Sequence, residues 1–193
     1  MPIHFADDPE VDRLVNTDPL ALLIAMLLDQ QVPLSWAFNG PNRLVERLNR
    51  PLDSGYLAAL DPETFAAIAA TKPAIHRYPR SMAARIQDLC SFLVDNYDGN
   101  AAAVWESTSD AQIVSDRLSS LPGFGPEKVK ITLAVLVKRF NVHLKGWVEL
   151  AAPFSDQQPR SVADIGSPED FERVKAWKKK QKVAGLNKQD SPA

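Results

Sequence analysis

The stretch Leu121–Lys130, LPGFGPEKVK, decides how this chain folds. A proline and two glycines surround a single phenylalanine, and a segment with helical spacing begins at once at Pro126. Residues 109–119 also have amphipathic helical spacing, so a short turn is expected to join two helices. Glycine accepts positive φ and lets another backbone come close. Leu121 and Phe124 are expected to anchor this turn in the apolar core.

The turn itself predicts an anion site. The amides of Gly123 and Gly125, with the N–H groups of the next helix's first turn, are expected to point outward. Lys128 and Lys130 would add positive charge nearby. Such a site holds a DNA phosphate without reading base sequence. The alternative is a glycine-rich helical turn that has no ligand.

Helix-start signals recur along the chain. Asp18-Pro19, Asp61-Pro62 and Ser167-Pro168 each place a capping residue before a proline, which suits the first helical position. Ser81 is expected to open another helix, which stops at Asp98-Gly99. No convincing alternation of period two is present. The sequence therefore predicts an all-α fold.

Composition limits the classes of function. With 193 residues, of which 45 % are apolar, the chain can bury one core or two small lobes that share a cleft. A formal net charge of −2 gives no global positive field, so nucleic acid would need a local basic patch. The lysine-rich stretch 175–182 offers one, although a solvated helix end explains it equally well.

Several kinds of site are not expected. The single cysteine, Cys90, excludes an internal disulfide and a cysteine-held cluster, and the histidines lack metal-ligand spacing. No metal or cofactor is therefore predicted. The apolar run Leu20–Leu28 has nine residues, whereas a membrane span needs about 20, so it predicts a buried helix. The acidic N-terminal stretch is unlike a signal peptide, which favours a cytoplasmic protein.

Two motifs together resemble a known family. The L-P-G-x-G turn between two helices resembles the helix-hairpin-helix motif of DNA repair proteins. The stretch DPLALLIAMLLDQQVPLSWAF resembles the early helix of the endonuclease III group of base-excision glycosylases in the HhH-GPD superfamily. IHRYPRSMAARIQDLCSFLVDNYDG resembles the family helix that lies between these two elements, and the order and spacing match over about residues 17–150.

The resemblance implies a two-lobed helical DNA glycosylase fold. A single domain would cover residues 1–186, with the helix-hairpin-helix at about 109–140. The N- and C-terminal helices would pack as a second lobe. Residues 187–193 would form a disordered tail.

The resemblance also implies a function, which is base-excision repair of double-stranded DNA by a monomer. The enzyme would flip a damaged or mispaired base out of the duplex and hydrolyse its N-glycosidic bond. Gln31 would fill the vacated stack, with Gln30 as its neighbour. The aromatic residues expected around the flipped base are Trp36, His76, Tyr78 and Trp147, and core packing is the alternative for each.

The chain differs from the family pattern at the positions of the catalytic residues. Lyase members carry a lysine where Glu127 stands here, and a carboxylate cannot form a Schiff base, so a monofunctional enzyme is expected. The family's essential aspartate is absent, because ungapped counting reaches Lys145. Glu149 lies four residues on and is the first candidate acid, unless it is only a solvent-facing residue. Asp29 is the second candidate, unless it is only a helix-end residue. The four cysteines of the family's iron–sulfur cluster are also missing.

Two other functions remain open. One is a catalytically inactive DNA-binding protein with a glycosylase fold, which the missing aspartate favours. The other is a protein-interaction adaptor that docks through its lysine-rich C-terminal helix. Only the two DNA-binding hypotheses predict an affinity for DNA that falls steeply with salt.

Overall fold

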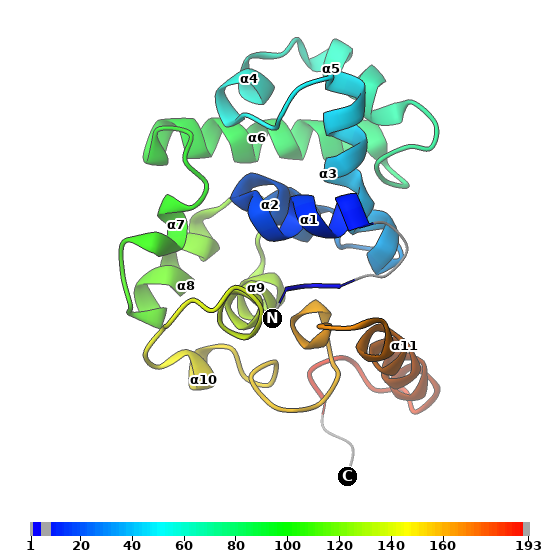
Figure 1. The fold of residues 1–193 in the computed structure, drawn as a ribbon, viewed down its shortest axis with the longest axis vertical. Coiled ribbons are helices and arrows are strands. Elements are labelled where there is room, and N and C mark those ends of the chain that lie inside the picture. Colours follow the sequence, from blue (N-terminus) through cyan, green and yellow to red (C-terminus); the bar gives the residue numbers. More distant parts are fainter. Residues whose placement is uncertain (1, 5–8, 191–193) are drawn as a thin grey trace. The chain divides into compact units, whose positions relative to one another are not determined.

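The computed structural model describes residues 2–4 and 9–190, and within these residues it contains helices and no strand (Figure 1). The all-α prediction is confirmed. The described chain forms two compact units. The α2 unit contains residues 9–104 and 120–124, and the α9 unit contains residues 2–4, 105–119 and 125–190.

One buried helix organises the α2 unit. In α2 (Pro19–Leu28), residues 20–28 are all buried, as expected for a helix that is apolar on every face. Helices α1 (Pro9–Thr17) and α3 (Leu34–Leu48) pack against it.

A second layer of the α2 unit is built on a long helix. Helices α4 (Ser54–Ala59) and α5 (Pro62–Ala70) lie along α6 (Pro79–Tyr97) (Figure 1).

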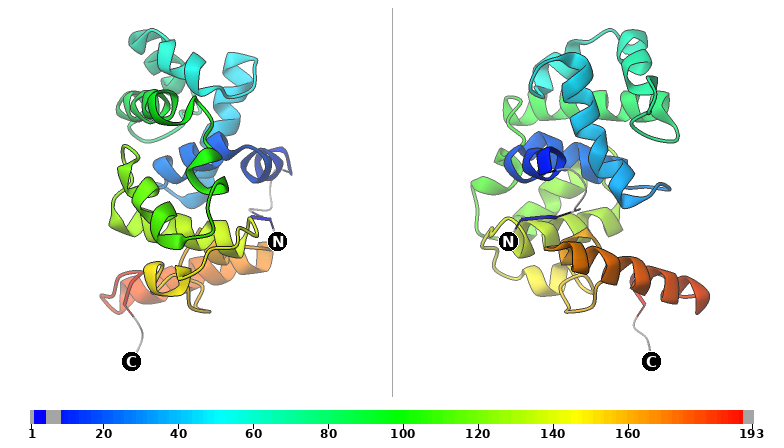
Figure 2. Two further views of the ribbon diagram at one scale, coloured as in Figure 1. Left: turned by 90° about the vertical axis from the view of Figure 1, so that its left-hand side faces the viewer. Right: turned by 45° about the vertical axis from the view of Figure 1, so that its right-hand side comes forward.

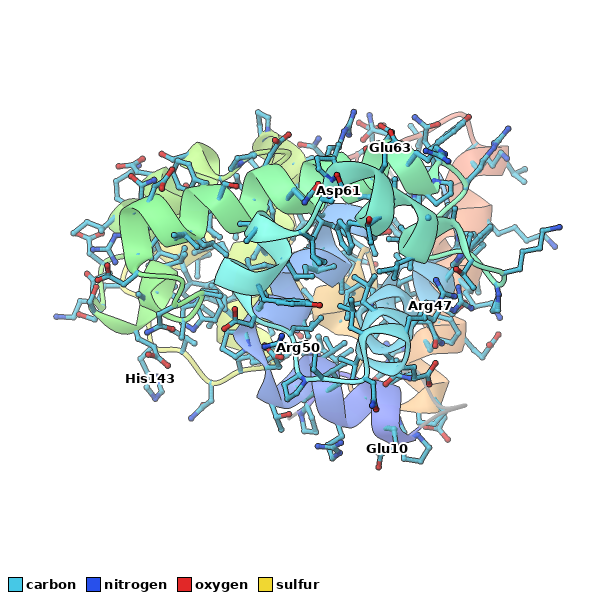
Figure 3. All side chains as sticks on the ribbon, turned by 90° about the horizontal axis from the view of Figure 1, so that it is seen from above. Glu10, Arg47, Arg50, Asp61, Glu63 and His143 are labelled. Carbon is cyan, nitrogen blue, oxygen red and sulfur yellow. The ribbon has the colours of Figure 1, made fainter. Side chains whose placement is uncertain are left out.

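Arg47 of α3, labelled in Figure 3, joins the α3 and α5 regions of this unit. Its guanidinium donates to the carbonyl oxygen of Ile68 at 2.9 Å and to that of Pro73 at 2.6 Å. Asp61 caps α5 by accepting a hydrogen bond from the Thr64 amide at 2.8 Å. The loop after α5 is therefore held to α3 by a side chain that bonds backbone carbonyls.

The predicted helix boundaries are largely correct. The Asp18 carboxylate accepts hydrogen bonds from the Leu20 and Ala21 amides at 2.8 and 3.2 Å, and Pro19 takes the first helical position. Helix α6 ends as expected, with Asp98 in the left-handed region at φ 51°. It begins at Pro79 instead of Ser81, because the fixed φ of proline suits a helix start.

The α9 unit is built on a second apolar helix. Helix α9 (Pro126–Lys138) buries Val129 and residues 131–136. The short elements α10 (Trp147–Leu150) and η1 (Val162–Asp164) contact α9.

Three more helices belong wholly or partly to this unit. Helix α8 (Ala111–Ser120) precedes the turn, and α7 (Ala103–Glu106) spans the boundary of the two units. Helix α11 (Pro168–Val183) is the orange-brown helix in Figure 2. It contacts η1, and its buried residues are Val174 and Gln181.

A buried arginine holds the end of the described chain. The Arg160 side chain is 1 % exposed and pairs with Asp156 at 2.8 Å. It also donates to the carbonyl oxygens of Lys188 and Asp190 at 3.0 and 2.6 Å. Residues 187–190, which were expected to be disordered, thus make specific hydrogen bonds. Residues 191–193 of the expected tail lie outside the described residues.

The terminal helices belong to different compact units. Helix α11 belongs to the α9 unit, and α1 belongs to the α2 unit, where Val11 and Val15 are buried and α1 contacts α2 and α3. The packing of the N- and C-terminal helices as a second lobe stays a prediction. Across residues 2–4 and 9–190, no helix is long and apolar enough to cross a membrane.

The cap of α2 gives a prediction that depends on pH. Burial raises the pKa of Asp18, while the Ala21 and Leu20 amides oppose this shift. Because the pKa of Asp18 in the folded state lies above its ordinary value of 3.8, ionisation of Asp18 lowers the free energy of unfolding as pH rises through that folded-state pKa. Asparagine keeps the cap without the charge. The free energy of unfolding of Asp18→Asn, minus that of the wild type, should therefore be larger at about pH 7 than at about pH 3.

Urea denaturation followed by circular dichroism measures this difference. Asp18→Ala is the control, because it removes the cap and should lose about 1 kcal/mol. A difference between wild type and Asp18→Asn that is the same at both pH values would contradict a raised pKa.

Candidate nucleic-acid interface

Gln30 holds the turn that follows α2. Its side-chain amide donates to the carbonyl oxygen of Leu27 at 2.7 Å, and its side-chain oxygen accepts from Arg85 at 3.0 Å. Its backbone oxygen is bonded to Nε2 of His76 at 2.8 Å. Gln30 is thus engaged on three sides within the α2 unit and is not a mobile side chain.

Gln31 has the opposite character. Its backbone is in the left-handed region, with φ 57°, and its side chain is exposed. A non-glycine residue pays a conformational cost there, and such residues persist where the surrounding structure fixes them. The bonds of Gln30 supply that constraint. The geometry presents Gln31 on the surface of the α2 unit, as its predicted role requires.

The tip of the glycine turn packs in the same unit. Gly123 has φ 83°, and a β-carbon at this position would collide with Cδ1 of Leu27. Leu121 and Phe124 are 2 % and 5 % exposed, so they anchor the turn as expected. Their burial means that they position the turn, while Gly123 and Gly125 are its exposed residues.

Gly125, unlike Gly123, has a backbone conformation and enough space for a residue with a side chain. Its φ of −73° and ψ of 171° are accessible to any residue, and a β-carbon would meet nothing within 4 Å. The fold therefore gives no internal reason for glycine at this exposed position. Close approach of a ligand to the first turn of α9 would give one. Lys128 and Lys130 lie half-buried on the first turns of the same helix.

Glu127 is paired with the C-terminal segment. Its carboxylate accepts from Lys188 Nζ at 3.2 Å and from the Gln189 side-chain amide at 3.3 Å. Its negative charge in the first turn of α9 opposes a bound anion, and Lys188 offsets part of that charge. No amine nucleophile occupies position 127.

The two candidate acids belong to different units. Asp29 is half-buried at the C-terminus of α2, and its N–H donates to the Ala25 carbonyl at 3.0 Å. Glu149 is exposed on α10 in the α9 unit. Water screens an exposed carboxylate strongly, so Asp29 has the better environment for stabilising a nearby cation.

The aromatic candidates have different environments. His76 is buried, and its Nδ1 accepts from the Tyr78 amide at 3.0 Å, so Nε2 carries the proton donated to Gln30. Trp36 is half-buried and donates to the Ala74 carbonyl at 2.8 Å. Tyr78 is 47 % exposed, whereas Trp147 is half-buried in the α9 unit. Within the α2 unit, Tyr78 is therefore the aromatic residue best exposed for stacking.

The sequence did not single out two arginines that matter. Arg85 of α6 orients Gln30 from 55 positions away, and Arg160 holds the C-terminal segment. No local motif marks either residue, so the sequence carries no signal for their roles. The single cysteine, Cys90, is buried and unreactive, because burial, with a smaller effect of Asp53, raises the pKa of its thiol to about 12.

Comparisons of the chain with protein-family models, with curated proteins and with solved structures find no match. Within the described residues, no group of three or more His, Cys, Asp or Glu side chains could hold a metal ion.

The contrast between the two glycines gives a second prediction. Gly123→Ala should lower the free energy of unfolding by about 2 kcal/mol, because it adds strain at positive φ and a collision with Leu27. Gly125→Ala should stay within about 1 kcal/mol of the wild type, because its backbone suits alanine. Urea denaturation of the two variants tests this, and equal losses would contradict the geometry described for the turn.

Proposed function

We propose that this protein is a monofunctional DNA glycosylase, which removes a damaged or mispaired base from duplex DNA. One observation carries the proposal. The exposed Gln31, in a strained turn fixed by Gln30, and the glycine tip packed on Leu27 belong to one compact unit. An exposed side chain on a fixed turn, in the same compact unit as a glycine turn suited to a DNA backbone, suits an enzyme that extrudes a nucleotide and fills the gap.

The phosphate backbone would bind through groups that do not read sequence. The open position at Gly125 lets a phosphate reach the first turn of α9, and Lys128 and Lys130 add charge there. In the α2 unit, the exposed Arg77 lies 5.3 Å above the ring of Tyr78 and offers a second cationic contact. The logarithm of the DNA-binding constant falls linearly with the logarithm of the salt concentration, and each phosphate that the protein neutralises adds about 0.9 to the steepness of that slope.

The chemistry would depend on a carboxylate and on water. As the bond from C1′ to the base nitrogen breaks, its electrons leave with the base and positive charge develops on the sugar. Asp29 and the negative end of the α2 dipole favour that charge. Water then adds its oxygen to C1′ and loses a proton. Glu149 is the second candidate for the same electrostatic role. Glu127 offers no amine, so the DNA strand stays intact.

A catalytically inactive DNA-binding protein is the second candidate function. It is favoured by the exposure of Glu149, the carboxylate nearest to the position where the resemblance implies an essential acid. In that case the Gln31 turn would recognise DNA distortion without cleaving the glycosidic bond.

A screen of end-labelled duplexes tests the activity. The duplexes carry uracil, hypoxanthine, 8-oxoguanine, alkylated adenine or a mismatch, and each is analysed with and without hot alkali. We expect strand breaks only after alkali, because base removal leaves an intact abasic strand. Asp29→Asn should lower the rate by about 10²–10³-fold, the usual effect of losing one preorganised electrostatic group. Loss of activity in Glu149→Gln alone would assign the acid to Glu149.

Gln31→Gly separates function from stability. Glycine relieves the positive-φ cost, so this variant should be more stable by up to about 1 kcal/mol. It should nevertheless lose about tenfold in rate, because nothing fills the gap in the duplex. Gln158→Ala, at another exposed glutamine, is the matched control. Strand breaks without alkali would contradict a monofunctional enzyme, and tight binding without any breaks would favour the inactive DNA-binding protein.

A further inference from the structure

A hollow of about 520 Å³ lies within the α9 unit, between the second half of α11 and the segment that follows it. Its lining includes Trp177, Gln181 and Lys182 of the helix, and Leu186 and Lys188 of the returning segment. Its volume is in the range typical of small-molecule sites.

The wall of the hollow is fixed by hydrogen bonds. The chain reverses after α11 at Gly185, with φ 71°, and the Leu186 amide donates to the Gln181 carbonyl at 2.9 Å. Arg160 then bonds the backbone oxygen of Lys188, whose ammonium pairs with Glu127. These contacts form the wall without a ligand, which lowers the cost of ordering it on binding.

The interior combines an aromatic ring with an unused amide. Trp177 is half-buried, and Arg160 stacks 5.3 Å from the centre of its ring. Gln181 is only 5 % exposed and lines the hollow, yet its side-chain amide has no hydrogen-bond partner among residues 2–4 and 9–190. The amide atoms keep contact with solvent through the hollow, so they can exchange water for a ligand at little cost. A ligand that supplies both a donor and an acceptor would satisfy this amide.

The rim carries mainly positive charge. Lys178, Lys182 and Lys188 line the hollow, and Glu127 is the opposing carboxylate in its lining. Lys182 is exposed at the mouth, so its ammonium can meet an anion. A ligand that matches these features has a flat aromatic body, a hydrogen-bonding edge and a negative group.

We propose that this hollow binds a nucleotide. The base stacks on Trp177, its hydrogen-bonding edge meets the Gln181 amide, and its phosphate meets Lys182 at the rim. Stacking on aromatic rings and amide contacts to base edges are established modes of nucleotide recognition. The nucleotide comes either as a free monophosphate or as one unit of a single strand. The inference does not depend on glycosylase activity.

Tryptophan fluorescence of the full-length protein tests the site. The chain has four tryptophans, so Trp177→Phe identifies the signal that comes from the hollow. The probes are dAMP, inorganic phosphate and a short oligoadenylate single strand. We expect dAMP to quench the wild type and not Trp177→Phe. Lys182→Ala should weaken dAMP binding about tenfold, since it removes a charge-assisted contact. Lys180→Ala, at an exposed lysine of α11 that is not among the lining residues, is the matched control and should bind as the wild type does.

Equilibrium dialysis with labelled dAMP gives a second readout, which does not need Trp177. Gln181→Leu should weaken binding and reduce the preference among the four bases, because the amide that meets the base edge is gone. Binding of dAMP but not of the oligonucleotide assigns a free nucleotide, and comparable or tighter binding of the oligonucleotide assigns a single strand. Phosphate that binds as tightly as dAMP would overturn the proposal. Wild-type affinity in both Trp177→Phe and Lys182→Ala would do the same.

Discussion

The complete burial of α2 is the constraint on which the α2 unit depends. Residues 20–28 are apolar and buried without exception, so no face of this helix is left for water. Each large apolar side chain contributes about 1.5–3 kcal/mol on burial, and the whole helix therefore outweighs any single polar contact. Neighbouring helices must cover every face. Only the ends of α2 can be polar, which is why Asp18 and Asp29 flank it.

That burial also determines what the candidate site can be. A helix that is enclosed along its length exposes chemistry only where it ends, at Asp29, Gln30 and Gln31. Gly123 meets the last full turn of α2 at Leu27. The glycine tip and the Gln31 turn are therefore held by the same apolar packing. A surface loop without this support could not keep Gln31 in a strained conformation.

The same arrangement recurs in the α9 unit with different residues. There a buried arginine, Arg160, bonds backbone carbonyls of a distant segment, much as Gln30 is bonded by His76 and Arg85. In both cases a polar side chain fixes irregular backbone, because backbone groups removed from water need partners. The first turn of α9 carries a negative side chain that is paired with a positive one. Glu127 disfavours an anion there, while Lys188 compensates, so the C-terminal segment influences the electrostatics of the turn that precedes α9.

Local sequence determined the secondary structure of this protein. Asp18, Asp61 and Ser167 begin helices because a cap bonds amides two or three residues away, and proline fixes its own φ. Gly123 marks a turn at positive φ for the same local reason. Helix-start signals and helical spacing predicted the all-α class, and the unbroken apolar run predicted the burial of residues 20–28.

Only the tertiary structure decided how these elements share their polar contacts. The bond between His76 and Gln30 joins residues 46 positions apart, and that between Lys188 and Glu127 joins residues 61 apart. Such contacts depend on how helices pack, and sequence spacing carries no signal for them. For the same reason no local pattern showed that Val11 and Val15 of α1 would be buried within the α2 unit. Hydrogen bonds between neighbouring residues determine where a helix starts, whereas the packing of distant helices determines which side chains meet in a site.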